Sequence, residues 1–301
     1  MAITVTQLTA FLAVVRGGSV TAAADELVVT QPSVSSALAA LGRELDCELF
    51  QRAGRGIRLT EAGSAFAPYA GDVIGLLERG RRAAQEAAAA TGHRLRIAAV
   101  TTAAESFVPQ MMRDFSRAHT DVELTLDVGN RAHVIDCVLR HSADVAISGK
   151  PPSDPRLVAE PLSENRIACI TAPEDPATAG RLRAAELADR AWLLREPGSG
   201  TRALNEQFLA DRDLRPRILE LGSNGAIKQA ARAGLGISLL SRSAVEAELA
   251  GGQLGEIRLR DAPPSRPWYV LRSSVGPERP VVEALLEHLR AHYAAGTAAA
   301  G

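Results

Sequence analysis

The hydrophobic residues near the start of the chain recur with helical spacing. In the first stretch they stand at positions i, i+3, i+4 and i+7, which are Leu8, Phe11, Leu12 and Val15. This spacing predicts an amphipathic helix that ends at Gly17 and Gly18. Ser19 can cap a second helix over residues 20–27, whose alanines allow a neighbouring helix to approach closely.

A third helix is expected to begin at Gln31, because Thr30 can cap it and Pro32 suits a first turn. Its inward face is apolar and consists of Val34, Leu38, Leu41 and Leu45. The opposite face is small and polar near its beginning, which fits the major groove of DNA. The residues expected to face that groove are Gln31, Pro32, Ser33, Ser35 and Ser36.

Two short strands follow, over residues 49–51 and 57–59, and a glycine-containing turn joins them. With the three helices, this hairpin gives the pattern of a winged helix-turn-helix. The hairpin carries three arginines, including Arg52 and Arg55, and no carboxylate, so its positive charge can neutralise DNA phosphates. The hydroxyl side chains expected to contact phosphates are those of Ser19, Thr21 and Thr60.

The overall composition gives no sign of this chemistry. The chain has 34 basic and 35 acidic residues, so its formal net charge of −1 indicates neither a nucleic acid nor a membrane as a partner. Its 301 residues, 46% of them hydrophobic and 23% charged, are typical of a soluble globular protein with more than one compact unit. The local placement of the arginines therefore matters more than the sum of charges.

The first sixty residues resemble the DNA-binding signature of LysR-type transcriptional regulators. The matching positions are Phe11, Gly18-Ser19, Ala23-Ala24, Leu27, Thr30-Gln31-Pro32, Val34-Ser35, Leu41, Leu45, Leu49-Phe50, Arg52, Arg55, Leu59-Thr60 and Ala62-Gly63. Three positions depart from the family: Gly42 replaces a usual glutamate, Asp46 a usual glycine, and Ser36 an arginine that often reads a base. A serine hydroxyl discriminates less between bases than a bidentate arginine does.

A heptad pattern follows, with apolar or small residues spaced alternately by four and three positions. These residues are Phe66, Ala70, Val73, Leu77, Gly80, Ala84 and Ala87. The pattern predicts a long linker helix that pairs with a second copy of the chain. A helix packed on its own domain is the alternative, because Gly71, Gly75 and Gly80 weaken the helix and the seam is rich in small residues. The resemblance favours pairing, since LysR-type regulators join subunits through this segment.

From residue 92 onward, strand-like runs alternate with helical ones, which predicts an α/β domain with parallel sheets. The set of runs repeats after residue 167, so two lobes are expected, and the last strand and helix return to the first lobe. This order resembles the two-lobed, periplasmic-binding-protein-like domain of LysR-type regulators. The expected division is a winged helix-turn-helix over 1–64, a linker helix over 65–91, and an effector-binding domain over 92–301, with lobe I at about 92–166 and 267–301 and lobe II at about 167–266.

Ligands of open α/β lobes bind beyond the carboxyl ends of the strands, where helix N-termini converge. Glycines and hydroxyls in such positions, with one added cation, predict a site for a small anionic effector. The expected binding residues are Thr101, Thr102, Ser148, Gly198, Ser199, Gly200, Thr201, Arg202, Ser223 and Asn224. Each of them can equally serve as a local helix cap or turn. The sequence near this site resembles the branch of the family that regulates carbon dioxide fixation and sulfur metabolism.

No cofactor or metal site is predicted. The glycines of 234–236 lack the third glycine of a dinucleotide fingerprint, and His288 and His292 have no third ligand nearby. The cysteines stand far apart at Cys47, Cys137 and Cys169, which argues against a disulfide framework, a zinc site or thiol sensing.

The N-terminus lacks the basic leader and cleavage site of a signal peptide, and no apolar run approaches the roughly 18 residues of a membrane span. We therefore expect a cytoplasmic protein that has no membrane partner. Through the resemblance, its expected partners are double-stranded promoter DNA with a dyad-symmetric site, a small anionic effector, further copies of itself in a dimer or tetramer, and RNA polymerase.

Two alternatives remain at this point. A cytoplasmic enzyme or binding protein could use the same two-lobed fold, but an enzyme would need a catalytic acid or nucleophile in the cleft, and none stands out. A solute-binding protein would lack the first ninety residues and carry an export signal. A regulator without enzymatic activity is the preferred interpretation.

Overall fold

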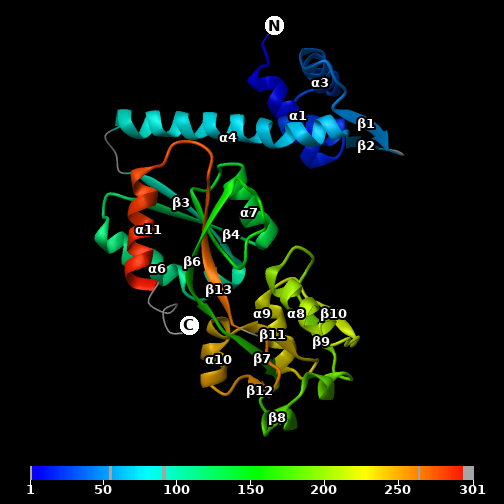
Figure 1. The fold of residues 1–301 in the computed structure, drawn as a ribbon, viewed down its shortest axis with the longest axis vertical. Coiled ribbons are helices and arrows are strands. Elements are labelled where there is room, and N and C mark those ends of the chain that lie inside the picture. The colour runs from blue at the N-terminus through cyan, green and yellow to red at the C-terminus, as the bar shows by residue number, and fades with distance from the viewer. Residues whose placement is uncertain (1, 54–55, 90–92, 264, 294–301) are drawn as a thin grey trace. The chain divides into compact units, whose positions relative to one another are not determined.

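The computed structural model describes residues 2–53, 56–89, 93–263 and 265–293 (Figure 1). The chain divides into two compact units. The first contains the stretch up to residue 90 together with Leu139–Ser142, and the second contains the rest.

The first unit begins with three helices, α1 (Val5–Gly17), α2 (Val20–Leu27) and α3 (Gln31–Leu45). Their predicted starts are confirmed: the Ser19 hydroxyl accepts a hydrogen bond from the backbone of α2, and the Thr30 hydroxyl accepts one from the backbone of α3. Buried apolar residues of all three helices form the core, among them Ala13, Val14, Ala23, Ala24 and Val34. Local capping and an apolar face together explain why the sequence predicts this region well.

The wing consists of two antiparallel strands, β1 (Phe50–Ala53) and β2 (Gly56–Leu59). The long helix α4 (Glu61–Ala89) follows directly and starts four residues earlier than the expected linker. Gly63 allows this early start, because a Cβ atom there would collide with the backbone oxygen of Leu49.

The heptad positions of α4 fall into two groups. Phe66 and Ala70 pack into the core of the first unit, as the alternative of a helix on its own domain requires. Farther along, Val73 and Leu77 keep 51% and 50% of their surface exposed. The apolar seam therefore serves the unit's own core at one end and stays open to solvent beyond it.

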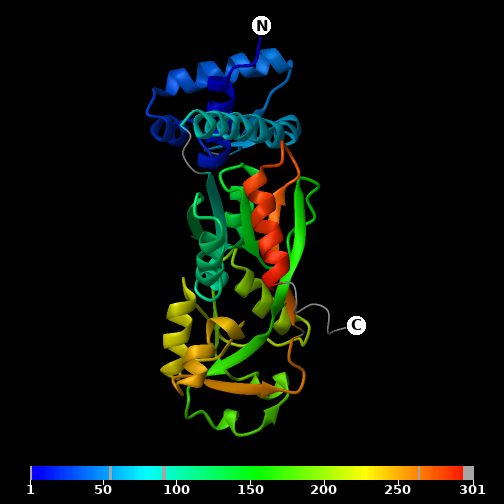
Figure 2. The same cartoon turned by 90° about the vertical axis from the view of Figure 1, so that its left-hand side faces the viewer.

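The second unit contains two lobes (Figures 1 and 2). Lobe I is a five-stranded sheet with the order β4-β3-β5-β13-β6, covered by helices. Its strands are β3 (Arg94–Val100), β4 (Glu123–Gly129), β5 (Val145–Ser148), β6 (Leu157–Asn165) and β13 (Arg266–Ser273). Its helices are α5 (Thr101–Ala104), α6 (Val108–Ala118), α7 (Arg131–Leu139) and α11 (Pro280–Tyr293).

Lobe II contains a four-stranded sheet with the order β11-β7-β12-β8 and a parallel pair, β9 with β10. Its strands are β7 (Ile167–Thr171), β8 (Arg181–Leu182), β9 (Trp192–Leu194), β10 (Ile218–Glu220), β11 (Ser238–Ser241) and β12 (Gly255–Leu259). Its α-helices are α8 (Gly200–Ala210), α9 (Asn224–Arg232) and α10 (Glu246–Ala250), and short 3-10 turns lie at Pro176–Thr178, Ala184–Leu187 and Arg242–Ala244.

The expectation of parallel sheets is confirmed only in part, since β3 is parallel to β4 and β5 but other strand pairs are antiparallel. In lobe I, β13 runs antiparallel to both β5 and β6, and in lobe II, β7 runs antiparallel to β11 and β12. The reason for lobe I is the connection between the lobes: β6 leads into lobe II and β13 returns from it, so the two strands lie side by side in opposite directions (Figures 1 and 2). Strands joined without a crossover helix need not be parallel.

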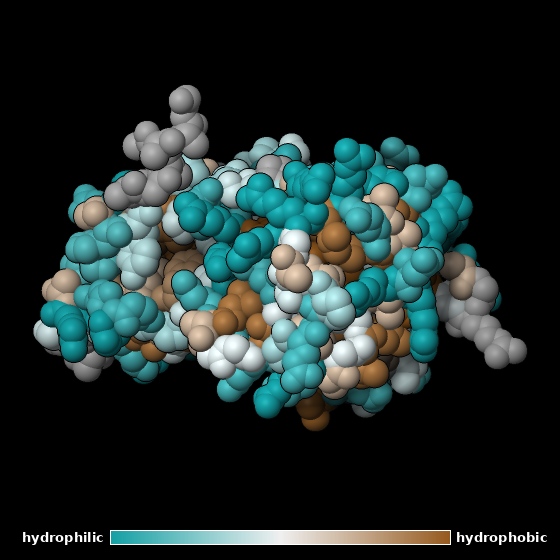
Figure 3. Space-filling model, turned by 90° about the horizontal axis from the view of Figure 1, so that it is seen from below, coloured by the Kyte–Doolittle hydropathy of each residue, from teal (hydrophilic) through white to brown (hydrophobic). Residues whose placement is uncertain are grey.

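The surface has the mixed character expected from the composition of the chain. In the view of Figure 3, hydrophilic side chains dominate and hydrophobic ones form small separate groups, as on most globular proteins. In the described part of the chain, no helix combines the length and the apolar character that a membrane crossing requires.

Candidate functional site

The start of α3 presents a polar surface. The residues expected to face DNA are all exposed there, namely Gln31, Pro32, Ser33, Ser35 and Ser36, and Val34 between them is buried. The Gln31 side-chain amide donates a hydrogen bond to the Thr21 hydroxyl over 2.8 Å, so α2 holds the first residue of α3 in place.

The three hydroxyls expected to contact phosphates differ in their surroundings. Thr21 is exposed beside Gln31. The Ser19 hydroxyl accepts from the backbone of Ala22, and the Thr60 hydroxyl donates to the carbonyl oxygen of Glu48 over 2.6 Å. The single proton of Thr60 is thus already used in a bond between the two segments that flank the hairpin. Thr21, which is exposed, is therefore the most available of the three.

The wing carries exposed arginines. Arg52 and Arg58 are both exposed, and Arg52 lies opposite Ile57 whereas Arg58 lies opposite Gln51. Since side chains alternate along a strand, these two arginines project from opposite faces of the hairpin. Arg55 lies outside the described residues.

A cavity of about 100 Å³ lies between the two lobes of the second unit. It is far larger than the space one water needs, so it suits a small metabolite. Six of the expected binding residues line it: Thr101, Thr102, Ser148, Ser199, Gly200 and Thr201. The other four, Gly198, Arg202, Ser223 and Asn224, are not among its lining residues.

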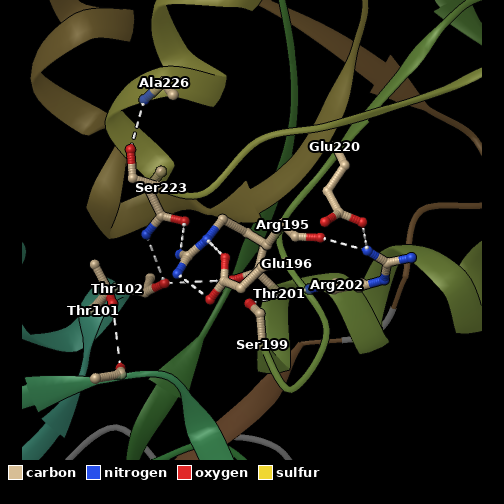
Figure 4. A network of polar contacts seen from close by, with 12 residues as sticks. Thr101, Thr102, Arg195, Glu196, Ser199, Thr201, Arg202, Glu220, Ser223 and Ala226 are labelled. Atoms are coloured by element: carbon tan, nitrogen blue, oxygen red, sulfur yellow. Dashed lines mark hydrogen bonds and ion pairs between the residues drawn. The ribbon is translucent and has the colours of Figure 1, made fainter.

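Asn224 and Thr102 connect the two lobes beside the cavity. Figure 4 shows Thr102 of lobe I facing Arg195 of lobe II. The Asn224 amide donates to the Thr102 hydroxyl over 2.9 Å and accepts from the Arg195 guanidinium over 2.8 Å. Asn224, Arg195 and Thr102 are all buried, which makes each bond costly to break. Asn224 therefore fastens the lobes together at the edge of the cavity.

Two serines that were expected to bind the effector cap helices. The Ser199 hydroxyl accepts from the backbone of Arg202 at the start of α8, and the Ser223 hydroxyl accepts from the backbone of Ala226 at the start of α9. Figure 4 shows the Ser223 bond. Ser199 lines the cavity as well as capping its helix, whereas Ser223 only caps.

Arg202 is held away from the cavity. Its guanidinium pairs with Glu206 over 2.7 Å. It also pairs with Glu220 over 2.5 Å and donates to the carbonyl oxygen of Arg195 (Figure 4). The two carboxylates, Glu220 foremost, raise the pKa of Arg202. Its position at the start of α8 led us to expect a ligand contact. Instead, its guanidinium is held in ion pairs with Glu206 on α8 and Glu220 on β10, and Arg202 does not line the cavity.

Four cationic side chains that were not predicted from the sequence line the cavity: Arg131, Lys150, Arg195 and Arg266. No aspartate or glutamate is among the described residues that line it. Burial, together with the charge of the neighbouring Arg131, lowers the pKa of Arg266. Arg131 Nε and the fully buried Ser148 hydroxyl have no hydrogen-bond partner within residues 93–263 and 265–293. Such polar atoms can be satisfied by a ligand.

Two of these four cations could have been predicted from the sequence. Arg131 follows the end of β4 and Lys150 follows the end of β5, so the rule that selected Thr101 and Ser148 applies to them as well. Arg266 begins β13, the strand that returns from lobe II, and only the folded lobes bring it to the cavity.

Two family models match the DNA-binding and two-lobed parts of the chain. Residues 5–64 match the bacterial regulatory helix-turn-helix protein, lysR family, and residues 88–294 match the LysR substrate binding domain. The chain belongs to the LysR family of transcriptional regulators. The resemblance read from the DNA-binding signature is thereby confirmed, as is a two-lobed effector-binding domain. LysR regulators bind promoter DNA and respond to a small-molecule effector.

Similar proteins extend over nearly the whole chain. The HTH-type transcriptional regulator CbbR of Rhodospirillum rubrum is 35% identical over 286 residues, which cover 95% of each chain. A RuBisCO operon transcriptional regulator of Acidithiobacillus ferrooxidans is 35% identical and covers 97% of this chain and 95% of its own. The expected likeness to regulators of carbon dioxide fixation is confirmed by these relatives.

A solved structure of the ligand-binding part is similar too. The regulatory domain of CcmR from Synechocystis PCC6803, in complex with 2-PG, is 31% identical and superimposes with a TM-score of 0.63. The match covers 66% of this chain and 96% of that domain.

Proposed function

We propose that this LysR-family regulator responds to a metabolite that carries two anionic groups and binds between the lobes of the second unit. The observation that carries the proposal is the uncompensated charge of the cavity. Arg131, Lys150 and Arg266 line it, and none of the three makes an ion pair within the described residues. Arg131 and Arg266 are half-buried, and the charge of Arg131 helps to lower the pKa of Arg266. A ligand with opposite charge relieves this repulsion.

The helices around the cavity add to this preference. The helix α7 begins at Arg131 and α8 begins at Gly200, and both residues line the cavity. The N-terminus of a helix carries a partial positive charge and free backbone N–H groups, which favour anions. The ligand of the CcmR domain, 2-PG, supports a phosphorylated carboxylate as the effector of this chain.

We assign DNA recognition to the start of α3 and to the wing. The bases are contacted by Gln31, Pro32, Ser33, Ser35 and Ser36, and phosphates are contacted by Ser19, Thr21, Arg52 and Arg55. The Thr60 hydroxyl, which donates to Glu48, is left out of this set. The open part of the α4 seam, with Val73 and Leu77, pairs two copies, so the dimer reads a dyad-symmetric promoter site. We carry assembly into tetramers and contact with RNA polymerase over from the resemblance to LysR-type regulators.

The working division is a DNA-binding domain over 1–64, a pairing helix over 65–91 and an effector domain over 92–301. We assign the protein to the cytoplasm, where promoter DNA and metabolites meet. We assign no enzymatic activity to it, since its relatives are named as transcriptional regulators and the described cavity lining offers no carboxylate or thiol for catalysis.

Genome-wide footprinting with the purified full-length protein tests the DNA-binding half of the proposal. We expect protected sites with two dyad-related halves whose spacing corresponds to whole turns of DNA. The Ser36→Glu variant should lose these sites, because a carboxylate at the outer face of α3 repels the DNA. Glu123→Gln in lobe I is the control and should retain them. Sites without any dyad relation would contradict the proposed dimeric recognition.

A further inference from the structure

Three side chains that commonly bind metals meet in lobe I, and none of them lines the cavity. They are Asp127 on β4 and His133 and Cys137 on α7. Each offers one ligand atom, and the three atoms lie within 4.8 Å of one another.

The local fold brings these side chains together. His133 and Cys137 are four residues apart, so they share one face of α7. That face lies over the end of β4, because only one residue separates the strand from the helix. Gly129 makes the close approach feasible, since a Cβ atom there would collide with the His133 ring.

The distances fit one metal ion. The His133 Nε2 atom lies 3.0 Å from Asp127 Oδ2, and Cys137 Sγ lies 3.5 Å from each of these two atoms. A tetrahedral zinc ion with ordinary bond lengths would separate nitrogen from oxygen by about 3.3 Å, and sulfur from either of them by about 3.5 Å. The three ligand atoms are therefore already spaced almost as such an ion requires.

The same three residue types form a catalytic triad in some enzymes, but the arrangement differs here. In a triad, the acid contacts the ring nitrogen opposite the one that faces the nucleophile. Here the Asp127 carboxylate and the Cys137 sulfur both approach Nε2 of His133. Convergence on a single nitrogen suits a shared metal ion and does not suit proton transfer along a triad.

We propose that Asp127, His133 and Cys137 bind a divalent ion of the zinc type. Cys137 is buried, whereas the His133 and Asp127 side chains are 46% and 56% exposed, so a fourth ligand position faces solvent and can hold water. Binding forms a metal–sulfur bond and releases the thiol proton of Cys137 to solvent, and the thiolate and carboxylate then balance the two charges of the ion.

This site departs from the expectation drawn from cysteine spacing. Widely spaced cysteines argue against a zinc site built from cysteine pairs. A mixed site needs a single cysteine, and its other two ligands here stand four and ten residues before Cys137. An ion would fasten α7 to β4 in the lobe whose residue Arg131 also lines the effector cavity.

Titration of the full-length apoprotein with Co²⁺ under anaerobic conditions tests the site. We expect one equivalent to bind per chain, with a thiolate-to-cobalt absorption band and the intense visible bands of a tetrahedral ion. Zn²⁺ should then abolish both. The Cys137→Ser variant should lose the thiolate band, and the exposed variants Asp127→Asn and His133→Ala should bind at least about tenfold more weakly.

Control variants separate this site from other metal-binding groups of the chain. Burial raises the pKa of Cys169 to about 12, so that thiol resists ionisation, and Cys169→Ser should leave the band unchanged. Cys47→Ser and the double variant His288→Ala, His292→Ala should also retain it. Absence of a thiolate band in the wild type, or its persistence in Cys137→Ser, would overturn the proposal.

Discussion

The cations of the wing and those of the cavity, which we propose to bind DNA and the effector, differ in their exposure to water. Arg52 and Arg58 of the wing are exposed, so water solvates their charge while no DNA is bound. Arg266 is shielded beside Arg131, and burial together with this neighbour lowers its pKa. We therefore expect the wing to cost the first unit little stability, and the cations of the cavity to lower the stability of the second unit until a ligand binds. Only the cavity is therefore expected to change its stability strongly on binding.

The largest effect is expected for Arg266→Gln. Loss of a shielded cation that pairs with the ligand should weaken binding of 2-PG or related phosphorylated carboxylates by at least about 30-fold. Calorimetry on the full-length protein measures this. The matched control is Arg202→Gln, because Arg202 pairs with Glu206 and Glu220 outside the cavity and should keep near-normal affinity. Equal losses in both variants would remove the distinction between the two arginines.

The next effect concerns the connection between the lobes. Asn224→Ala removes a side chain that makes hydrogen bonds with both Thr102 and Arg195. These two buried side chains then each lose one hydrogen-bond partner. We expect a loss of about 1–3 kcal/mol in the free energy of unfolding of the second unit, measured by denaturant titration. Gln229→Ala, at an exposed position of the same helix, should change it by less than about 0.5 kcal/mol. Similar results for the two variants would contradict the role of Asn224.

The sequence predicts some of these residues and misses others, and the difference depends on how far apart in the chain the contacting residues lie. Helix starts such as Ser19 and Thr30 were predictable, because a cap and its helix are neighbours in the chain. Cavity residues at strand ends, such as Ser148, followed from a general rule of α/β folds. Arg266 and the outward turn of Arg202 could not be predicted, because they depend on contacts between segments far apart in sequence.

A smaller effect should distinguish a partly buried ion pair of lobe II from an exposed one. Asp175 accepts hydrogen bonds from Arg190, Thr171 and the backbone of Ala177, and the Arg190 bond contributes most to lowering the pKa of Asp175. Its stabilisation is therefore full above the ordinary carboxyl pKa and is lost as the pH falls toward the lower folded pKa. Asp175→Asn should remove about 1 kcal/mol of stability at neutral pH and less in acid, since solvent screens the partly exposed Arg190.

Thermal unfolding recorded from neutral to acidic pH checks this expectation. Asp213→Asn serves as the control, because the pair of Asp213 with Arg215 is almost fully exposed and should contribute little. A loss for Asp175→Asn that stays the same down to strongly acidic pH would disprove the pairing.

The smallest effect is expected at the wing. Arg52→Gln should reduce the salt dependence of operator affinity by about one unit of slope, because one phosphate contact is lost, and it should leave the stability of the first unit unchanged. Affinity measured over a range of salt concentrations gives the slope. Arg94→Gln is the control, since Arg94 pairs with Glu123 in lobe I. An unaltered slope for Arg52→Gln would exclude that side chain from DNA binding.

A footprint of the full-length protein on a bound promoter, repeated with a panel of ligands, tests the central claim most directly. The panel contains 2-PG and other phosphorylated carboxylates, with neutral molecules of similar size for comparison. We expect at least one doubly anionic ligand and no neutral ligand to change the protected bases. Arg266→Gln should keep the ligand-free footprint and lose the response. A response to neutral ligands alone, or an undiminished response in Arg266→Gln, would contradict regulation through the charged cavity.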